Sequence, residues 1–209
     1  MKILKTLTLL SIVLFTACKS DDDTIDNQVN LNLESDRNAL IEIYNANTST
    51  LTWDISTSDV STWSGITVEN DRVAVLNVAN SGIAIFPINA MQKLTALRKL
   101  VANGNNIESI DISNNTNLKN LALFDNQITT INLSNNILLE QVLLEHNLLE
   151  NLDVSMLPNL TDLKGGSNNF TKSVNIANGN NSNMLRMQLS SNNLSCVQVD
   201  SGATNGFNG

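Results

Sequence analysis

One pattern is written three times in succession, as LRKLVANGNNIESIDISNNTN (97–117), LKNLALFDNQITTINLSNNIL (118–138) and LEQVLLEHNLLENLDVSMLPN (139–159). The copies begin 21 residues apart, and a fourth begins at Leu160. A fixed period of this length indicates a solenoid that coils once per repeat, because one coil cannot bury its apolar side chains without its neighbours. The sequence therefore predicts one elongated domain.

Each copy places apolar residues and one asparagine at fixed positions. In the second copy these positions hold Leu118, Leu121, Leu123, Asn126, Ile128, Ile131, Leu133 and Ser134. The pattern resembles that of leucine-rich repeats, and the resemblance implies a strand-rich solenoid of the α/β horseshoe class with a parallel concave sheet and a helical N-terminal cap. Independently, the alternation around Leu121 predicts a short strand that pairs in parallel with the equivalent strand of the next coil.

The recurring asparagine lies where the chain is expected to turn away from the strand. Backbone groups there lose their ladder partners, and a buried carboxamide can satisfy both a donor and an acceptor. We expect such a structural ladder at Asn105, Asn126, Asn147, Asn168 and Asn192. The alternative is that these residues are solvated turn formers in a chain rich in asparagine. Asn136 is expected in an outer turn, where replacement by leucine should cost far less stability than the same change at Asn126.

The first 17 residues have the features of an export signal. Lys2 and Lys5 precede an apolar run, Leu7 to Phe15, that is too short for a stable membrane span. The segment at 15–18 resembles a bacterial lipobox, which implies lipidation of Cys18. The acids at 21–23 resemble the tract after the lipid-bearing cysteine in surface lipoproteins of Bacteroidetes, although a plain solvated leader is the alternative. Together these resemblances imply a lipid-anchored protein of the outer membrane, exposed at the cell surface.

Residues 18–33 are polar and acidic and are expected to be a flexible tether. Residues 34–72 resemble the N-terminal cap of extracellular leucine-rich-repeat proteins, with a helix of about ten residues after Ser35 and Asp36. The usual cap cysteines are missing, so Trp53 and Trp63 are expected to close the end by packing. The rival interpretation of these tryptophans is a platform on which a sugar ring stacks.

Residues 73–200 are expected to form about six coils. The first coil runs from Val73 to 96 and carries Gly82–Pro87, which resembles the ending of a longer repeat class and predicts a wider outer side. The segment 193–200 resembles the last repeat of bacterial proteins that continue into a cap with a second cysteine. We therefore expect a chain that is a natural truncation or a fragment, with an exposed final coil, an unpaired Cys196 and a truncated tail at 201–209.

No motif of an enzyme is present. The chain has one histidine, His146, two repeats away from Cys196, which is too far for a cysteine–histidine pair. We predict no cofactor and no metal site. Removal of residues 1–17 would leave 10 basic and 20 acidic side chains, and this acidic excess argues against nucleic acid as a partner. The chain is expected to be a monomer that meets the membrane only through its lipid.

The outward positions of the strands predict the binding surface. Val101, Ala122 and Leu143 should lie in one column of the concave face, with Phe124 beside them and Asp125, Glu145 and His146 as a polar rim. Apolar centres with polar rims are typical of protein-binding faces, whereas glycan-binding faces carry exposed aromatics among amides and carboxylates. The sequence therefore favours a protein partner. A glycan ligand, or a passive role in a larger surface assembly, remains as the alternative.

Overall fold

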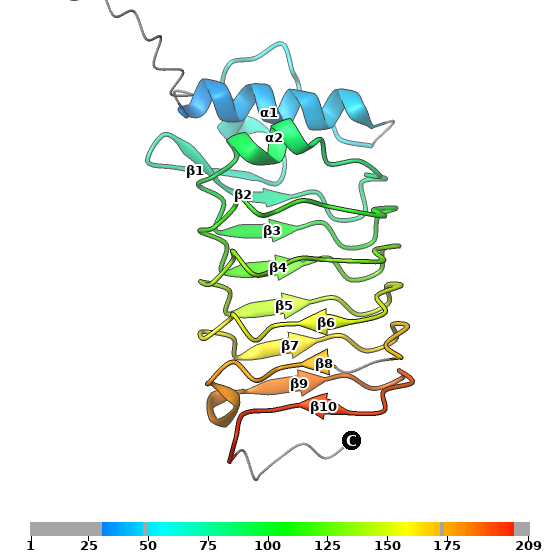
Figure 1. Cartoon of the computed structure of the whole chain (residues 1–209). Helices are drawn as coiled ribbons and strands as arrows, with labels where there is room; N and C mark the ends of the chain where they lie inside the picture. Colours follow the sequence, from blue (N-terminus) through cyan, green and yellow to red (C-terminus); the bar gives the residue numbers. More distant parts are fainter. Residues whose placement is uncertain (1–30, 48–49, 172–173, 203–209) are drawn as a thin grey trace, which may run out of the picture.

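The computed structural model describes residues 31–47, 50–171 and 174–202. These residues form a stack of coils with two helices at its N-terminal end (Figure 1). The expected signal segment, Cys18, and the expected tether up to residue 30 lie outside the described residues. So does the tail at 203–209.

A parallel sheet runs along one side of the stack. It contains β2 (Arg72–Asn77), β3 (Lys99–Val101), β4 (Asn120–Ala122), β5 (Gln141–Leu143), β7 (Asp162–Lys164) and β9 (Arg186–Gln188), paired in this order. The register aligns the central apolar residue of each strand, so that Leu100 pairs with Leu121 and Leu121 with Val142. The predicted parallel pairing of equivalent strands is confirmed.

An antiparallel strand covers the N-terminal edge of this sheet. β1 (Ile66–Glu69) pairs with β2 through a turn at Asn70 and Asp71, both of which have positive φ. Two consecutive residues of this kind suit the twist of a tight hairpin. The first parallel strand therefore presents no open edge to another chain.

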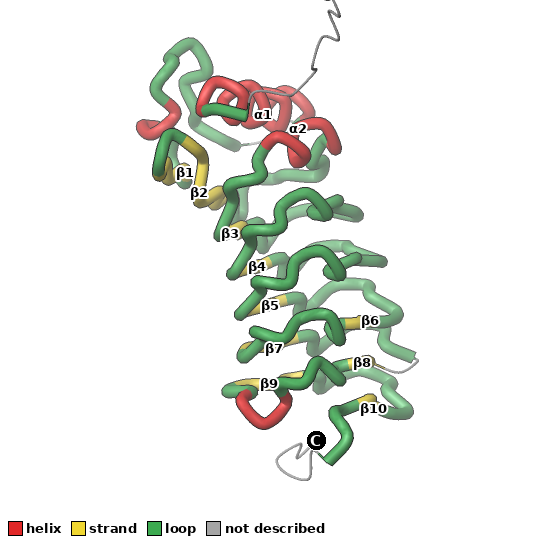
Figure 2. Tube along the Cα trace, turned by 60° about the vertical axis from the view of Figure 1, so that its left-hand side comes forward, coloured by secondary structure: helices red, strands yellow, loops and turns green. Residues whose placement is uncertain are grey.

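A second, smaller sheet lies on the opposite side of the coils (Figure 2). It is formed by β6 (Leu152–Asp153), β8 (Val174–Asn175) and β10 (Val197–Gln198), which pair in parallel. The sequence interpretation did not anticipate this sheet. Its signal is the second apolar alternation in each copy, such as Leu152-Asp153-Val154.

The interior of the stack is filled by aliphatic side chains. Leu118, Leu121, Leu123 and Ile128 of the second copy are fully buried. The first coil carries α2 (Ile88–Lys93) on its outer side, in line with the wider coil that we expected there. The last coil differs, because Met187, Leu189, Leu194, Val197 and Val199 are only partly buried. A short helical turn, η2 (Asn181–Asn183), lies just before β9.

The predicted ladder asparagines each bond to two coils at once. Asn126 Nδ2 donates to Ala102 O of the preceding coil at 2.9 Å and to Leu123 O of its own coil at 3.0 Å. Its Oδ1 accepts a hydrogen bond from Ile107 N at 3.0 Å. Equivalent bonds are made by Asn105, Asn147, Asn168 and Asn192. Except for the partly exposed Asn192, these side chains are buried, so they are not solvated turn formers.

A second set of buried asparagines lies on the outer side of the coils. Asn136 is fully buried, and its Nδ2 donates to Ile112 O and Asn115 O at 3.0 Å. Asn136 therefore lies on the outer side, as expected, but its burial and its hydrogen bonds were not predicted. The equivalent position holds Leu157 in the next coil, also fully buried, and Asn178 after it. Because Leu157 replaces the asparagine in one coil, asparagine does not recur regularly at this position, and the sequence did not reveal this second ladder.

The N-terminal cap closes the first coil with a helix and an aromatic stack. α1 spans Leu33–Ala46 and is longer than predicted, because it begins before Ser35, where Asn32 caps it by accepting a hydrogen bond from Ser35 N. Trp53 stacks on Trp63 with ring centroids 5.3 Å apart, and both indoles are at most 4% exposed. They are covered by the cap itself, so the alternative of a sugar-stacking platform is wrong.

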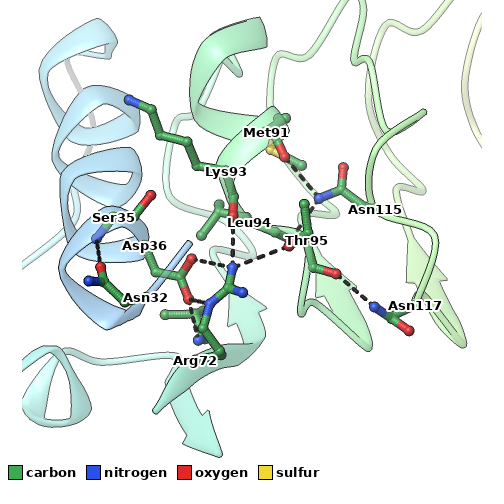
Figure 3. Close-up of polar contacts among 11 residues, drawn as sticks. Asn32, Ser35, Asp36, Arg72, Met91, Lys93, Leu94, Thr95, Asn115 and Asn117 are labelled. Atoms are coloured by element: carbon green, nitrogen blue, oxygen red, sulfur yellow. Dashed lines mark hydrogen bonds and ion pairs between the residues drawn. The ribbon is translucent and has the colours of Figure 1, made fainter. Parts of the chain in front are cut away.

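A buried ion pair joins the cap to the repeats (Figure 3). Asp36 is completely buried in α1 and accepts two hydrogen bonds from the guanidinium of Arg72, each of 2.8 Å. Asp36 Oδ2 also accepts a hydrogen bond from Val73 N at 2.7 Å. Arg72 in turn donates to Lys93 O at the end of α2 and to Thr95 Oγ1. One carboxylate thereby fixes α1, the start of β2 and, through Arg72, the end of α2.

Substitution of a ladder asparagine should destabilise the domain. We expect Asn126→Leu to lower the free energy of unfolding by about 1–3 kcal/mol, because it leaves the buried N–H of Ile107 without an acceptor. Asn136→Leu should cost less, since Asn136 Oδ1 accepts no hydrogen bond and the next coil holds leucine in the same position. Urea unfolding of the purified variants measures both effects.

The matched control for this comparison is Asn135→Leu. Asn135 is exposed and makes only a surface hydrogen bond to Ser113 O. If Asn126→Leu and Asn135→Leu unfold at the same urea concentration, the ladder does not stabilise the fold.

Removal of the carboxylate that joins cap and repeats should be more damaging. Asp36→Ala should lower the free energy of unfolding by about 3–5 kcal/mol, because it leaves a largely buried guanidinium without its partner. Glu34→Ala removes an exposed acid from the same helical turn and serves as the control. A loss of stability that is equal in the two variants, measured by urea unfolding, would show that the ion pair is dispensable.

Candidate functional site

The outward side chains of the parallel strands form columns across the concave sheet. Strand pairing places Asn77, Val101, Ala122, Leu143, Lys164 and Gln188 side by side in one column. A neighbouring column contains Lys99, Asn120, Gln141, Asp162 and Arg186. The sheet therefore brings together the predicted apolar residues Val101, Ala122 and Leu143.

The predicted apolar patch is less exposed than its outward direction suggested. Ala122 is only 9% exposed, and Val101, Phe124 and Leu143 are half-buried. Side chains on a sheet cover one another, and a methyl group between two larger neighbours is the most covered. None of the three half-buried residues packs against the hydrophobic core. Val101, Ala122, Phe124 and Leu143 thus form an apolar surface that does not project from the sheet, here named the apolar floor.

A polar rim follows the ends of the strands. Asp125 and His146 are exposed, and Asp125 Oδ1 lies 3.2 Å from His146 Nδ1. Both residues have a left-handed backbone, with φ of 53° and 55°. The asparagines at 105, 126, 147, 168 and 192 form the inner ladder, and Ser81 takes the place of the asparagine in the first coil. The residue directly before each of these positions has the same left-handed conformation. These residues are Asn80, Gly104, Asp125, His146, Ser167 and Ser191.

An ion-pair network occupies the C-terminal half of the face. Arg186 donates to both carboxylate oxygens of Asp162 at 2.8 and 2.7 Å, and Gln141 Nε2 donates to Oδ2 at 2.8 Å. Burial raises the pKa of Asp162, but the hydrogen bonds from Arg186 and Gln141 and the nearby positive charges outweigh it, so the pKa lies below its usual range. The hydrogen bond to Asp162 also raises the pKa of Arg186. This carboxylate is ionised and fully paired.

Glu145 is the second acid on this face, and it is only half satisfied. Its Oε1 lies 3.3 Å from Lys164 Nζ, while its Oε2 is buried and has no hydrogen-bond partner. The side chain of Glu145 itself is 21% exposed. Glu145 therefore carries unused acceptor capacity beside the apolar patch.

The large apolar side chains that are most exposed lie away from the concave face. They are Ile85, Ile88, Ile137, Leu138, Leu148, Met156 and Leu185. A polar hollow of about 410 Å³ lies beside the inner ladder and is lined by Glu150, Asn168, Asn169, Thr171, Ser191, Asn192 and Asn193. No aromatic side chain is among these lining residues, so the hollow does not have the character of a glycan site as defined above.

Within residues 31–47, 50–171 and 174–202, no cluster of three histidine, cysteine, aspartate or glutamate side chains could hold a metal ion. In the same ranges no helix is long and apolar enough to cross a membrane. Cys196 is a free, exposed thiol in the last coil, and Cys18 lies outside the described residues.

The sequence matches no model of a known family, and no curated protein resembles it closely enough to count as a match. Solved structures do resemble the fold. The ectodomain of BIR2 from Arabidopsis thaliana superposes with a TM-score of 0.64 at 18% identity, covering 80% of this chain and 95% of that one. The leucine-rich-repeat ectodomain of the receptor kinase SOBIR1, from the same plant, gives 0.62 at 19% identity, covering 80% and 97%.

A bacterial structure is more similar in sequence over a shorter part. The functional domain of InlJ from Listeria monocytogenes is 32% identical, with a TM-score of 0.50 over 55% of this chain. The chain spans only 24% of that domain, which is described as containing a cysteine ladder. In the present chain the ladder residues are asparagines. The similarity to these structures shows that the predicted fold is correct, and the chain is a leucine-rich-repeat solenoid.

Proposed function

We propose that this protein is a cell-surface binding module, held in the outer membrane by a lipid on Cys18, that binds a protein partner on its concave face. The binding residues in this proposal are Val101, Ala122, Phe124, Asp125, Leu143, Glu145 and His146. The single observation that carries it is the apolar floor of Val101, Ala122, Leu143 and Phe124. Val101, Ala122 and Leu143 are paired neighbours on the sheet, and Phe124 follows two residues after Ala122. Val101, Phe124 and Leu143 do not pack against the hydrophobic core.

The form of this surface suits a protein. Its apolar centre is bordered by charged groups, with Glu145 and Lys164 on one side and Asp125 and His146 along the rim. Interfaces between proteins combine a desolvated centre with a polar border in this way. Among solved structures with this fold, one is a complex of BIR3 with SERK2. That example concerns those proteins, and it supports a protein as the partner class here.

Glycan binding is the less favoured function. The two tryptophans that could have stacked on a sugar are buried in the cap, and the polar hollow has no aromatic lining. A passive role as a spacer predicts that no change on the concave face alters any interaction of the protein. The binding experiment below therefore separates it from the proposed function.

The apolar floor should be required for partner binding and not for folding. We expect Phe124→Ala combined with Leu143→Ala to weaken binding about 100-fold, because both side chains lie at the centre of the proposed interface. The free protein should unfold close to the wild-type midpoint. Binding is measured with the purified full chain in detergent, against an array of surface proteins and glycans.

The control is Ile137→Ala combined with Leu138→Ala, which removes two exposed apolar side chains from an outer turn. It should leave binding unchanged. Wild-type affinity of the Phe124→Ala, Leu143→Ala variant for a partner found on the array would place the interface elsewhere on the molecule.

The anchor can be tested in cells. Cys18→Ala should release the protein from the outer-membrane fraction or leave it unprocessed, because the thiol that carries the lipid is lost. Cys196→Ala should fractionate as wild type does. Removal of the domain from intact cells by added protease would show that it faces outward. A Cys18→Ala variant that remains in the membrane fraction after normal processing would contradict the lipid anchor.

A further inference from the structure

The two acids on the concave strands differ in how far the protein satisfies them. Asp162 receives three hydrogen bonds from Arg186 and Gln141. Glu145 has one ammonium group near Oε1 and nothing at Oε2, which is buried. An ionised carboxylate has acceptor sites on both oxygens, and a buried one without a donor is unfavourable. The unused acceptor is therefore a property of Glu145 and not of the face as a whole.

Apart from Lys164, the residues at equivalent positions on either side of Glu145 are a phenylalanine and a glycine. Phe124 belongs to the preceding coil, and Phe124 O and Glu145 O occupy equivalent places, since each accepts a hydrogen bond from the preceding coil and from its own ladder asparagine. In the next coil the equivalent residue is Gly166, whose carbonyl oxygen accepts a hydrogen bond from His146 N in the same way. A side chain at Gly166 would lie 3.1 Å from Ser190 O. Glu145 thus lies between an aromatic ring and a position without a side chain.

We propose that Glu145 receives a lysine or arginine side chain of the protein partner, and that an apolar side chain next to this cation packs on Phe124 and Leu143. This inference rests on the proposed function and specifies the chemistry of its partner. Turning of the Glu145 carboxylate toward the cation gives its second oxygen the donor that it lacks in the free protein. The ring of Phe124, which holds the equivalent position of the preceding coil, offers the cation a second favourable contact.

The charge of the chain is complementary to such a partner. The net charge is −8, and Asp125 adds an exposed carboxylate close to Phe124. An acidic protein attracts a basic segment at long range and accelerates its association. The basic groups of the neighbouring strands, Lys164 and Arg186, are already paired within the face.

Lys164 competes with the cation of the partner for the carboxylate of Glu145. The Lys164 ammonium group lies 3.3 Å from Glu145 Oε1, so a cation from the partner must approach a carboxylate that already has a positive charge beside it. Removal of this lysine should therefore strengthen the binding of a basic segment. A purely structural pair between Lys164 and Glu145 has no such consequence.

The test uses a displayed library of short random peptides, selected on the purified full chain in detergent. We expect the selected peptides to carry lysine or arginine next to a large apolar residue. Their affinity, measured by fluorescence anisotropy, should fall about tenfold in Glu145→Gln. It should rise about threefold or more in Lys164→Met, since one competing charge is removed.

Two variants control for net charge. Glu150→Gln removes an exposed acid away from the concave face, and Lys119→Met removes a lysine that pairs with Glu140 outside the proposed interface. Both should leave the affinity of the selected peptides within about twofold of wild type. Equal effects of Glu145→Gln and Glu150→Gln would show that the peptides sense overall charge, and this overturns the inference.

The failure of this inference can be separated from failure of the proposed function. Selected peptides that depend on Phe124 and Leu143 but bind Glu145→Gln normally, or that carry no excess of basic residues, overturn the inference and leave the concave face as the binding surface. A library that yields no binder sensitive to Phe124→Ala and Leu143→Ala overturns both.

Discussion

The carboxamide that bonds two coils at once is the interaction on which the rest of the molecule depends. Where the chain leaves each strand, its backbone groups have no sheet partner, and one asparagine supplies donors to carbonyls in two coils and accepts an N–H from the earlier one. These bonds fix the spacing and the rotation of each coil relative to the last. The strands then fall into one register, the leucines meet in the interior, and the outward side chains align in columns. Without a constant relation between coils there would be no continuous face to bind anything.

The repeat pattern was sufficient to predict the fold, the strand pairing and the membership of each column, because all three follow from a fixed period. What it could not predict are properties of single side chains. Asp36 looked like a residue at the start of a helix, and its role as a buried partner of Arg72 depends on contacts between segments far apart in the chain. Asn136 looked like a turn residue because Leu157 interrupts the series to which it belongs. The alternation placed Ala122 on the outer face correctly, but its coverage depends on the sizes of the adjacent side chains.

The concave face is divided along the axis of the stack. Its N-terminal half carries the apolar residues Val101 and Ala122 beside a column with Lys99 and Asn120, and in its C-terminal half Asp162 and Arg186 neutralise each other. Glu145 lies at the boundary, with Phe124 from one coil before and Lys164 from one coil after. At this boundary an apolar contact and an incompletely paired carboxylate lie side by side. The two ends of the molecule also differ, since α1 and the stacked tryptophans cover the first coil whereas the described residues of the last coil leave their apolar side chains partly exposed.

The left-handed residue before each inner-ladder asparagine has a consequence for how such a surface can diversify. A backbone with φ near +55° admits glycine, asparagine, aspartate and a few other residues at tolerable cost, and disfavours β-branched side chains. Only a few residue types, most of them polar, are therefore expected at the rim positions, whatever the ligand. A polar border is a by-product of coil geometry as much as a product of selection for recognition. The outward positions of the strands have no such restriction. Specificity for one ligand over another must therefore depend on the side chains at these positions.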